Sequence, residues 1–120
     1  MPSMKGTAWP KASVEKGELL EARLRRFKSD KRQMFGAPVW FVNGNMFAGV
    51  FADGIFARFS EKDRTELKND ARPFEPVAGR AMSEYLTLSS SIVGDGAELD
   101  RVLDLSYRYV SSIKPKKKEK

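Results

Sequence analysis

Apolar residues recur at helical spacing near the beginning of the chain. Leu20, Leu24 and Phe27 stand at positions i, i+4 and i+7, and mostly charged residues fill the positions between them. This spacing places the apolar side chains on one face of a helix that begins at about Val14. Acidic residues come early in the segment and basic residues late, which suits the helix dipole. The pattern therefore predicts a first helix.

The apolar period changes to two in the next part of the chain, which predicts strands joined by tight turns. The predicted strands cover residues 39–42, 46–52 and 55–59. Asn43-Gly44 separates the first two strands and Asp53-Gly54 the second and third, and both dipeptides favour two-residue hairpin turns. We therefore expect a three-stranded antiparallel meander.

Polar residues that begin helices mark the second half of the chain. Ser60 stands at a helix N-cap, and Leu67 closes the short helix that follows. Prolines on both sides of Phe74 restrict that region to extended structure at the edge of a sheet. Residues 84–88 alternate and predict another strand, after which Ser, Gly and Asp indicate a loop.

A long apolar stripe predicts a final helix. Asp95 caps this helix, and the stripe runs from Leu99 to Ile113, just before Pro115. The predicted order is α-β-β-β-α-β-β-α, which makes an α+β fold with an antiparallel sheet packed by helices. The predicted parts are a flexible N-terminal arm (1–12), one domain (13–113) and a disordered basic tail (114–120).

Counting from two-residue turns gives a predicted register for the meander. Trp40 then opposes Phe47, and Phe51 opposes Phe56. One face carries Trp40, Val42, Phe47, Gly49, Phe51, Phe56 and Arg58. The other face carries Val39, Phe41, Met46, Ala48, Val50, Ala52, Ile55, Ala57 and Phe59. Both predicted faces are mainly apolar.

An antiparallel sheet with one face in water alternates polar and apolar residues, and this meander does not. Contiguous apolar patches are rare on monomers, so we expect the chain's own helices, a second copy or a partner to cover the aromatic face. The candidate interaction face is Trp40, Phe47, Phe51, Phe56 and Arg58. A platform that stacks nucleic-acid bases is an alternative, but basic residues are not interleaved on the neighbouring strands.

The net charge of +6 is concentrated at the two ends of the chain. Residues 1–32 carry +5, residues 33–113 carry −3 and residues 114–120 carry +4. Such ends are able to make weak, salt-dependent contacts with nucleic acid. The candidate contacts are Arg23, Arg25, Arg26, Lys116, Lys117 and Lys118. A solubilising, disordered end is the simpler explanation of the lysines, and we prefer it.

The composition excludes several kinds of chemistry. The chain of 120 residues has no cysteine and no histidine, so it lacks disulfides, thiol nucleophiles and the commonest general base. Acidic clusters in residues 61–66 and 95–104 are explained by helix N-termini. Ser89, Ser90 and Ser91 have no histidine to activate them. We therefore assign no catalytic, cofactor-binding or metal-binding residues, and we do not expect an enzyme.

Hydropathy and composition also bear on the compartment. No apolar run approaches the roughly 20 residues that cross a bilayer. The N-terminus lacks the apolar stretch of a signal peptide. We expect a cytoplasmic protein of one domain that does not contact membranes.

Short motifs that resemble one known family run through the sequence. In the first half they are Met34-Phe35-Gly36, Phe41-Val42-Asn43-Gly44-Asn45-Met46-Phe47-Ala48-Gly49-Val50, Arg58-Phe59-Ser60 and Asp63-Arg64. In the second half they are Ala71-Arg72-Pro73-Phe74-Glu75-Pro76, Gly79-Arg80, Met82 and Glu84-Tyr85. Over about residues 17–114 the chain resembles the N-terminal domain of the TfoX/Sxy competence regulators. It departs from them at Ala37, where the family often has a second glycine.

The resemblance implies a bacterial cytoplasmic protein with an antiparallel sheet packed by helices. It implies a group linked to the regulation of competence genes through a transcription activator, and it implies no catalytic residue and no cofactor. The regulators carry a further helical domain, so we expect a stand-alone relative of their first domain.

Three functional hypotheses follow from the sequence. The first is a regulatory or protein-interaction module with a protein partner, which is able to form a homodimer through the aromatic face. The second is an accessory nucleic-acid binder that uses the basic N-terminal helix and the lysine tail. The third is a small-molecule binder or enzyme with a pocket between helix and sheet. The sequence leaves open whether Arg58, Arg72 and Arg80 form a site.

Overall fold

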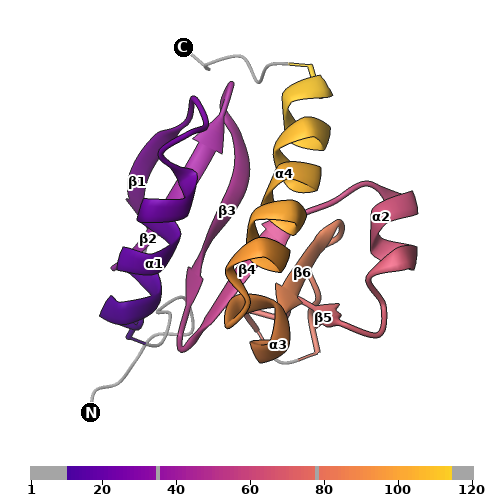
Figure 1. Ribbon diagram of the computed structural model, residues 1–120, viewed down its shortest axis with the longest axis horizontal. Coiled ribbons are helices and arrows are strands. Elements are labelled where there is room, and N and C mark those ends of the chain that lie inside the picture. Colours follow the sequence, from indigo (N-terminus) through magenta and orange to yellow (C-terminus); the bar gives the residue numbers. More distant parts are fainter. Residues whose placement is uncertain (1–10, 35, 78, 115–120) are drawn as a thin grey trace.

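The computed structural model describes residues 11–34, 36–77 and 79–114 (Figure 1). The elements in the first half are α1 (Val14–Leu24), β1 (Asp30–Met34), β2 (Ala37–Val42), β3 (Asn45–Phe51) and β4 (Gly54–Arg58). The elements in the second half are α2 (Glu61–Glu66), β5 (Ala71–Pro73), β6 (Tyr85–Leu88), α3 (Ser90–Val93) and α4 (Gly96–Ser112). The predicted α+β class is confirmed. Most of the predicted arm (1–12) and tail (114–120) lies outside the described residues.

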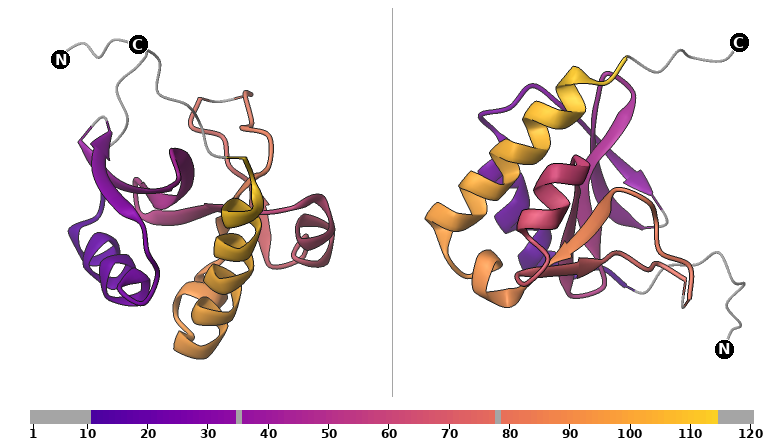
Figure 2. Two further views of the ribbon diagram at one scale, coloured as in Figure 1. Left: turned by 90° about the horizontal axis from the view of Figure 1, so that it is seen from above. Right: turned by 90° about the vertical axis from the view of Figure 1, so that its right-hand side faces the viewer.

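Six antiparallel strands form one sheet in the order β1-β2-β3-β4-β6-β5. Helices α1 and α4 lie side by side against one face of the sheet (Figures 1 and 2). The main core lies between them and the strands. It includes Leu20 and Leu24 of α1 and Leu99, Val102, Leu103 and Val110 of α4. The chain therefore covers this face with its own helices.

Side-chain caps begin the helices where the sequence predicts them. The Ser60 hydroxyl accepts a hydrogen bond from the Asp63 N–H at 3.2 Å at the start of α2. The Asp95 carboxylate accepts hydrogen bonds from two N–H groups in the first turn of α4. These bonds satisfy donors that have no partner inside the helix.

Two elements are present that the sequence pattern does not predict. Strand β1 pairs with β2 at the edge of the sheet, and most of its side chains are exposed. The predicted loop after β6 contains the short helix α3, in which the Ser89 hydroxyl accepts a hydrogen bond from the Ile92 N–H at 3.3 Å. Ile92 is the buried residue of this turn.

The predicted register of the meander is wrong at two places. Phe41 opposes Met46 as predicted, but Trp40 opposes Ala48, so that Phe47 is an extra residue in a β-bulge. In the second hairpin Phe51 opposes Gly54 instead of Phe56. The turn therefore consists of the two residues before Gly54 instead of Asp53-Gly54.

The register errors divide the candidate interaction face between the two sides of the sheet. Trp40 and Phe47 lie in the core beneath the helices, and the bulge reverses the alternation after Phe47, so that Ala48 and Val50 face the same core. Phe56 lies in a second cluster on the opposite side, with Phe51 packed against it. Trp40, Phe47, Phe51, Phe56 and Arg58 therefore do not share one face.

Among the described residues, Phe74 and the segment around it pack on the second face of the sheet. Phe74, which is 1% exposed, stacks on Phe56 with ring centres 4.2 Å apart. The Phe74 N–H donates to the Tyr85 carbonyl at 3.1 Å, and the Met82 N–H donates to the Phe74 carbonyl at 2.8 Å. These bonds tie Phe74 to the start of β6 and to Met82, and so hold its ring against Phe56.

Gly49 explains why the hairpin adopts this register. It opposes Phe56 across β3 and β4, and a Cβ atom at Gly49 would lie 2.8 Å from the Phe56 Cζ atom. It would also lie 3.1 Å from the Pro38 carbonyl oxygen. The Phe56 ring thus occupies space that only a glycine leaves free.

Gly49→Ala is therefore expected to lower the free energy of unfolding by about 1–2 kcal/mol, because the ring or the strand must shift. Gly54→Ala is the matched control, since its Cβ atom would meet its nearest neighbour at an ordinary 3.5 Å. Urea unfolding of both variants measures the difference. Equal stabilities for the two variants would show that Phe56 does not set the register.

Candidate functional site

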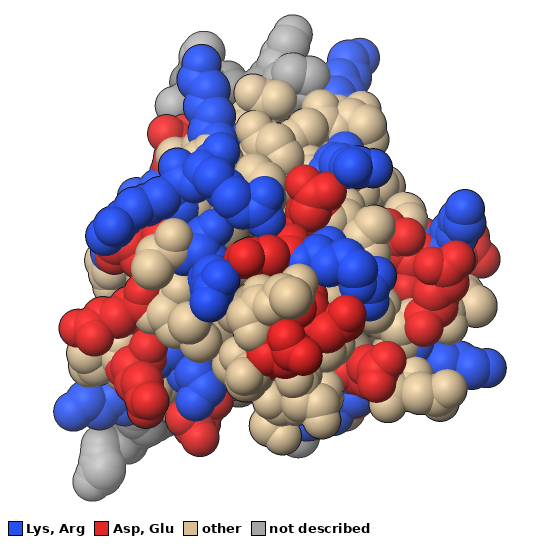
Figure 3. Space-filling model, in the orientation of Figure 1, with Lys and Arg blue, Asp and Glu red and all other residues tan. Residues whose placement is uncertain are grey.

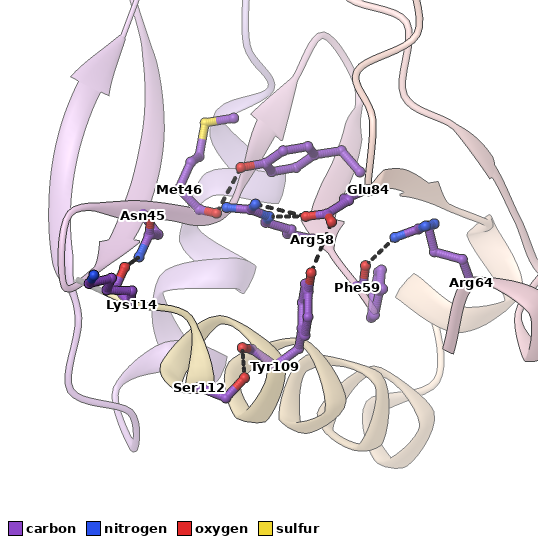
Figure 4. A network of polar contacts seen from close by, with 10 residues as sticks. Asn45, Met46, Arg58, Phe59, Arg64, Glu84, Tyr109, Ser112 and Lys114 are labelled. Atoms are coloured by element: carbon purple, nitrogen blue, oxygen red, sulfur yellow. Dashed lines mark hydrogen bonds and ion pairs between the residues drawn. The ribbon is translucent and has the colours of Figure 1, made fainter. Parts of the chain in front are cut away.

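A polar network joins the sheet to helix α4. Arg58 ends β4, and Glu84 directly precedes β6. The Nε and Nη2 atoms of Arg58 each lie 2.7 Å from Oε1 of Glu84. The hydroxyl of Tyr109, on α4, donates to Oε2 of Glu84 at 2.9 Å. Figure 4 shows that the Glu84 carboxylate accepts hydrogen bonds from the strand residue Arg58 and from the helix residue Tyr109.

The residue next to Glu84 extends the network into the second face of the sheet. The Tyr85 hydroxyl donates to the Met46 carbonyl at 3.0 Å, and this bond is buried. The Arg58 guanidinium lies 5.5 Å from the centre of the Tyr85 ring, within the range of a cation–π interaction. Arg58 therefore lies between two tyrosines and one carboxylate.

The pKa shifts in the network keep each of its three side chains in its usual ionisation state at neutral pH. Burial alone raises the pKa of Glu84, but hydrogen bonds from Arg58 and Tyr109 outweigh burial, and the pKa is lowered. Burial alone lowers the pKa of Arg58, but Glu84 reverses this, and the pKa is raised. Burial raises the pKa of Tyr109, and its bond to Glu84 acts in the same direction. These shifts favour a charged Arg58–Glu84 pair and a neutral Tyr109 hydroxyl. Such a set of groups suits a structural role.

Glu84 carries an unusual backbone conformation. Its φ angle is 76°, in the left-handed region that side chains other than glycine rarely adopt. The Glu84 carbonyl accepts a hydrogen bond from the Phe59 N–H at 2.8 Å. Backbone and side chain thus both hold Glu84 in this conformation.

Two of the basic residues predicted to contact nucleic acid bind Asp100 of α4. Arg23 Nη1 lies 2.9 Å from Oδ2 of Asp100 on α4. Arg26 Nη2 donates to the Asp100 carbonyl at 3.0 Å. A Cβ atom at Gly96 would lie 2.6 Å from Arg23 Nη2, so this glycine makes room for the guanidinium. The third helix residue, Arg25, is exposed. Lys116, Lys117 and Lys118 lie outside the described residues.

Strand β1, at the edge of the sheet, has one cationic side chain on each side of the sheet, Lys31 and Arg32. Lys31 lies on the α1 side, 2.8 Å from Glu21 Oε1 and 5.7 Å from the centre of the Trp40 ring. Arg32 lies 4.8 Å from the centre of the Phe41 ring, and Phe41 packs against the second cluster. We call β1 together with Arg25, Lys28, Lys31 and Arg32 the basic edge.

The basic edge has more positive than negative charge. Among the described residues, Arg25, Lys28 and Arg32 form no salt bridge within 4.0 Å. Asp30 and Glu21 are the carboxylates of the same region. Figure 3 shows blue side chains gathered on the side where Figure 1 places α1 and β1. Within the described part of the chain, no further strand pairs with the outer side of β1.

A family model for the TfoX N-terminal domain matches residues 22–110. The chain belongs to the TfoX N-terminal domain family. No curated protein matches it. The matched part of this TfoX N-terminal domain contains the whole network of Arg58, Glu84 and Tyr109, and it also contains the basic edge.

The described residues offer little else for binding chemistry. Within 11–34, 36–77 and 79–114, no group of three or more acidic, histidine or cysteine residues is placed to hold a metal ion. No helix in these ranges is both long and apolar enough to cross a membrane. Arg72 and Arg80 are exposed and are not part of the network around Arg58.

The sequence does not indicate the network in advance. Tyr109 stands outside the predicted apolar stripe of the last helix, and Glu84 is predicted as the first residue of a strand. A tyrosine beside such a stripe is a weak sequence signal that α4 meets a polar group at this position.

Proposed function

We propose that this TfoX N-terminal domain is a non-enzymatic, cytoplasmic regulatory module that binds an acidic segment of a protein partner along the basic edge. The open outer side of β1 is the observation that carries the proposal. An edge strand presents N–H and C=O groups that an extended segment of another chain is able to pair with.

The charges on β1 support a partner of opposite charge rather than a second copy. Antiparallel pairing of two β1 strands would bring Lys31 and Arg32 of one copy near those of the other, and like charges on facing strands are destabilising. Charged edge residues are a common protection against self-association. An acidic segment would instead gain from the same two side chains, one on each face.

The polar network supports a structural role for the rest of the domain. Glu84 ties α4 to the sheet through Arg58 and Tyr109. Arg23 and Asp100 tie α1 to α4. Both connections keep the elements beside β1 in place. The pKa of Glu84 is lowered and that of Arg58 is raised, so both move away from neutrality, opposite to what a general acid or base requires. A homodimer stays a prediction, which the mass of the purified protein in solution tests.

A nucleic-acid partner is the second candidate, since Arg25, Lys28 and Arg32 are exposed. It is weaker because Arg23 and Arg26 are engaged by Asp100 of α4, whose carboxylate neutralises part of their charge. The two candidates differ in what they require. Nucleic acid requires cations spaced for phosphates, whereas an acidic protein segment also requires the backbone of β1.

Binding of two labelled probes tests the proposal. The first probe is a peptide of alternating Glu and Val, and the second is a single-stranded DNA of the same net charge. We expect the domain to bind the peptide more tightly than the DNA, as measured by fluorescence anisotropy. Lys28→Glu/Arg32→Glu should weaken peptide binding about tenfold.

Lys62→Glu/Lys68→Glu is the matched control, because it makes the same charge change at exposed residues of α2 and its flank. This control should leave peptide binding within about twofold. Tighter binding of DNA with a steep salt dependence would favour the second candidate. An equal loss in both double variants would show that net charge alone attracts the peptide, and would contradict the proposal.

A further inference from the structure

The register of β2 shows which of its backbone groups face β1. In an antiparallel pair, residues that bond to the neighbouring strand alternate with residues whose N–H and C=O groups point away from it. Val42 opposes Asn45 across the two-residue turn between β2 and β3, so the backbone groups of Val42 face β3. By alternation along β2, the backbone groups of Phe41 and Val39 face β1.

The same alternation identifies the open backbone groups of β1. Asp30 opposes Phe41 and Arg32 opposes Val39, so the backbone groups of these two β1 residues face β2. The N–H and C=O groups of Lys31 and Gln33 point away from β2. Within the described ranges no strand pairs with them. An added strand would therefore bond to residues 31 and 33.

The helix side of β1 gives an acidic side chain little net attraction. Side chains along a strand alternate between the two sides of a sheet, and Lys31 lies on the helix side. Its Nζ atom is already 2.8 Å from Oε1 of Glu21 on α1. An acidic side chain placed beside this pair would meet one charge of each sign.

The second face of the sheet presents three different side chains at alternate positions of β1. Asp30 and Arg32 are exposed, and neither forms a salt bridge within 4.0 Å among the described residues. The Arg32 guanidinium lies 4.8 Å from the centre of the Phe41 ring, which holds the cation over this face. Met34 is half-buried against the second cluster. The order along β1 is therefore anion, cation, apolar group.

We propose that the segment bound at the basic edge runs antiparallel to β1, with an apolar residue opposite Met34, an acidic residue opposite Arg32 and a basic residue opposite Asp30. This inference rests on the proposed function and adds to it the sequence pattern apolar-x-acidic-x-basic. Opposite charges on directly facing residues are favourable and like charges are unfavourable, so the domain recognises the order of the charges as well as their sum. The antiparallel direction continues the pairing of every strand pair in the described sheet.

Two labelled peptides of identical composition and net charge test the inference. The matched peptide contains Val-Thr-Glu-Thr-Lys, and the exchanged peptide contains Val-Thr-Lys-Thr-Glu. The wild type should bind the matched peptide about tenfold more tightly than the exchanged peptide, as measured by fluorescence anisotropy.

A variant of the domain with the same net charge provides the matched control. Asp30→Arg/Arg32→Asp exchanges the two charges at exposed positions, and it should bind the exchanged peptide more tightly than the matched one. Equal affinities for the two peptides in both proteins would overturn the inference.

The Glu-Val peptide separates a failure of this inference from a failure of the proposed function. If the Glu-Val peptide binds and the two ordered peptides bind equally, only the recognition of charge order is wrong. If none of the three peptides binds, the proposed function is wrong as well.

Nuclear Overhauser contacts test the direction of the bound segment. In the complex with the matched peptide, the valine methyl protons should contact the methyl protons of Met34. Valine contacts to the side chain of Asp30 instead would show a parallel segment and would overturn the proposal.

Discussion

Phe47→Ala is expected to lower the free energy of unfolding by about 3–5 kcal/mol, the usual cost of removing a buried aromatic ring. Phe47 is 0% exposed. The centre of its ring lies 5.9 Å from that of Phe27 and 5.6 Å from that of Tyr107, so one side chain joins β3, the segment after α1 and α4. The cavity left by alanine would separate all three. Urea unfolding, with the slope compared between variants, measures the loss.

Phe41→Ala provides the matched control for Phe47→Ala. Phe41 is half-buried on the opposite side of the sheet, where it packs against the second cluster. We expect a loss of about 1–2 kcal/mol, less than half of that at Phe47, because less apolar surface returns to water. A larger loss at Phe41 than at Phe47 would contradict the β-bulge and the face assignment that follows from it.

Glu84→Ala is expected to lower the free energy of unfolding by about 2–3 kcal/mol, because a half-buried arginine and a tyrosine hydroxyl lose their partner together. Glu84→Gly removes the same carboxylate but suits the left-handed backbone at a φ angle of 76°. The glycine variant should therefore be about 1 kcal/mol more stable than the alanine variant. If alanine is the more stable of the two, the backbone at this position is not strained.

The contribution of Glu84 to the free energy of unfolding should decrease as the pH is lowered. Its folded-state pKa is lowered from 4.5, because hydrogen bonds from Arg58 and Tyr109 and the charges of Arg58 and Arg64 outweigh burial. The contribution is therefore fully present above pH 4.5 and is lost as the pH falls through the lowered value. The stability difference between the wild type and Glu84→Gln should shrink below pH 4.5. A difference that grows on acidification would contradict this assignment.

Parts of the fold with a strong periodic pattern are predictable from the sequence. The stripe of α4 and its cap at Asp95 give the helix and its start. The cap at Ser60 gives α2. Both signals arise locally, since burial of one helix face and satisfaction of the first N–H groups depend on residues a few positions apart.

Strand β1 and the β-bulge depend on pairing and packing between strands rather than on the apolar pattern within one segment. Four of the five residues of β1 are exposed, so the strand has no apolar alternation and is held by its pairing with β2. The turn after Phe51 places Phe56 opposite Gly49 across the hairpin, where the ring occupies space that only a glycine leaves free. Hairpin dipeptides alone favour the other register, and tertiary packing overrides them.

The candidate site was less predictable than the fold. Arg25 is exposed as expected for a binding residue, but Arg23 and Arg26 join α1 to α4 through Asp100, 74 to 77 positions along the chain. The network of Arg58, Glu84 and Tyr109 likewise combines residues 25 and 26 positions apart. Charge counts identify basic residues but not the carboxylates that neutralise them.

Hydrogen exchange of the backbone amides, with and without the saturating Glu-Val peptide, tests most directly whether β1 is the binding edge. The account predicts slower exchange for those amides of residues 31–33 that point away from β2. The amides of β5, at the other edge of the same sheet, should be unchanged and serve as the internal control. Slower exchange at β5 alone, or no change at β1 when the peptide is bound, would contradict the account.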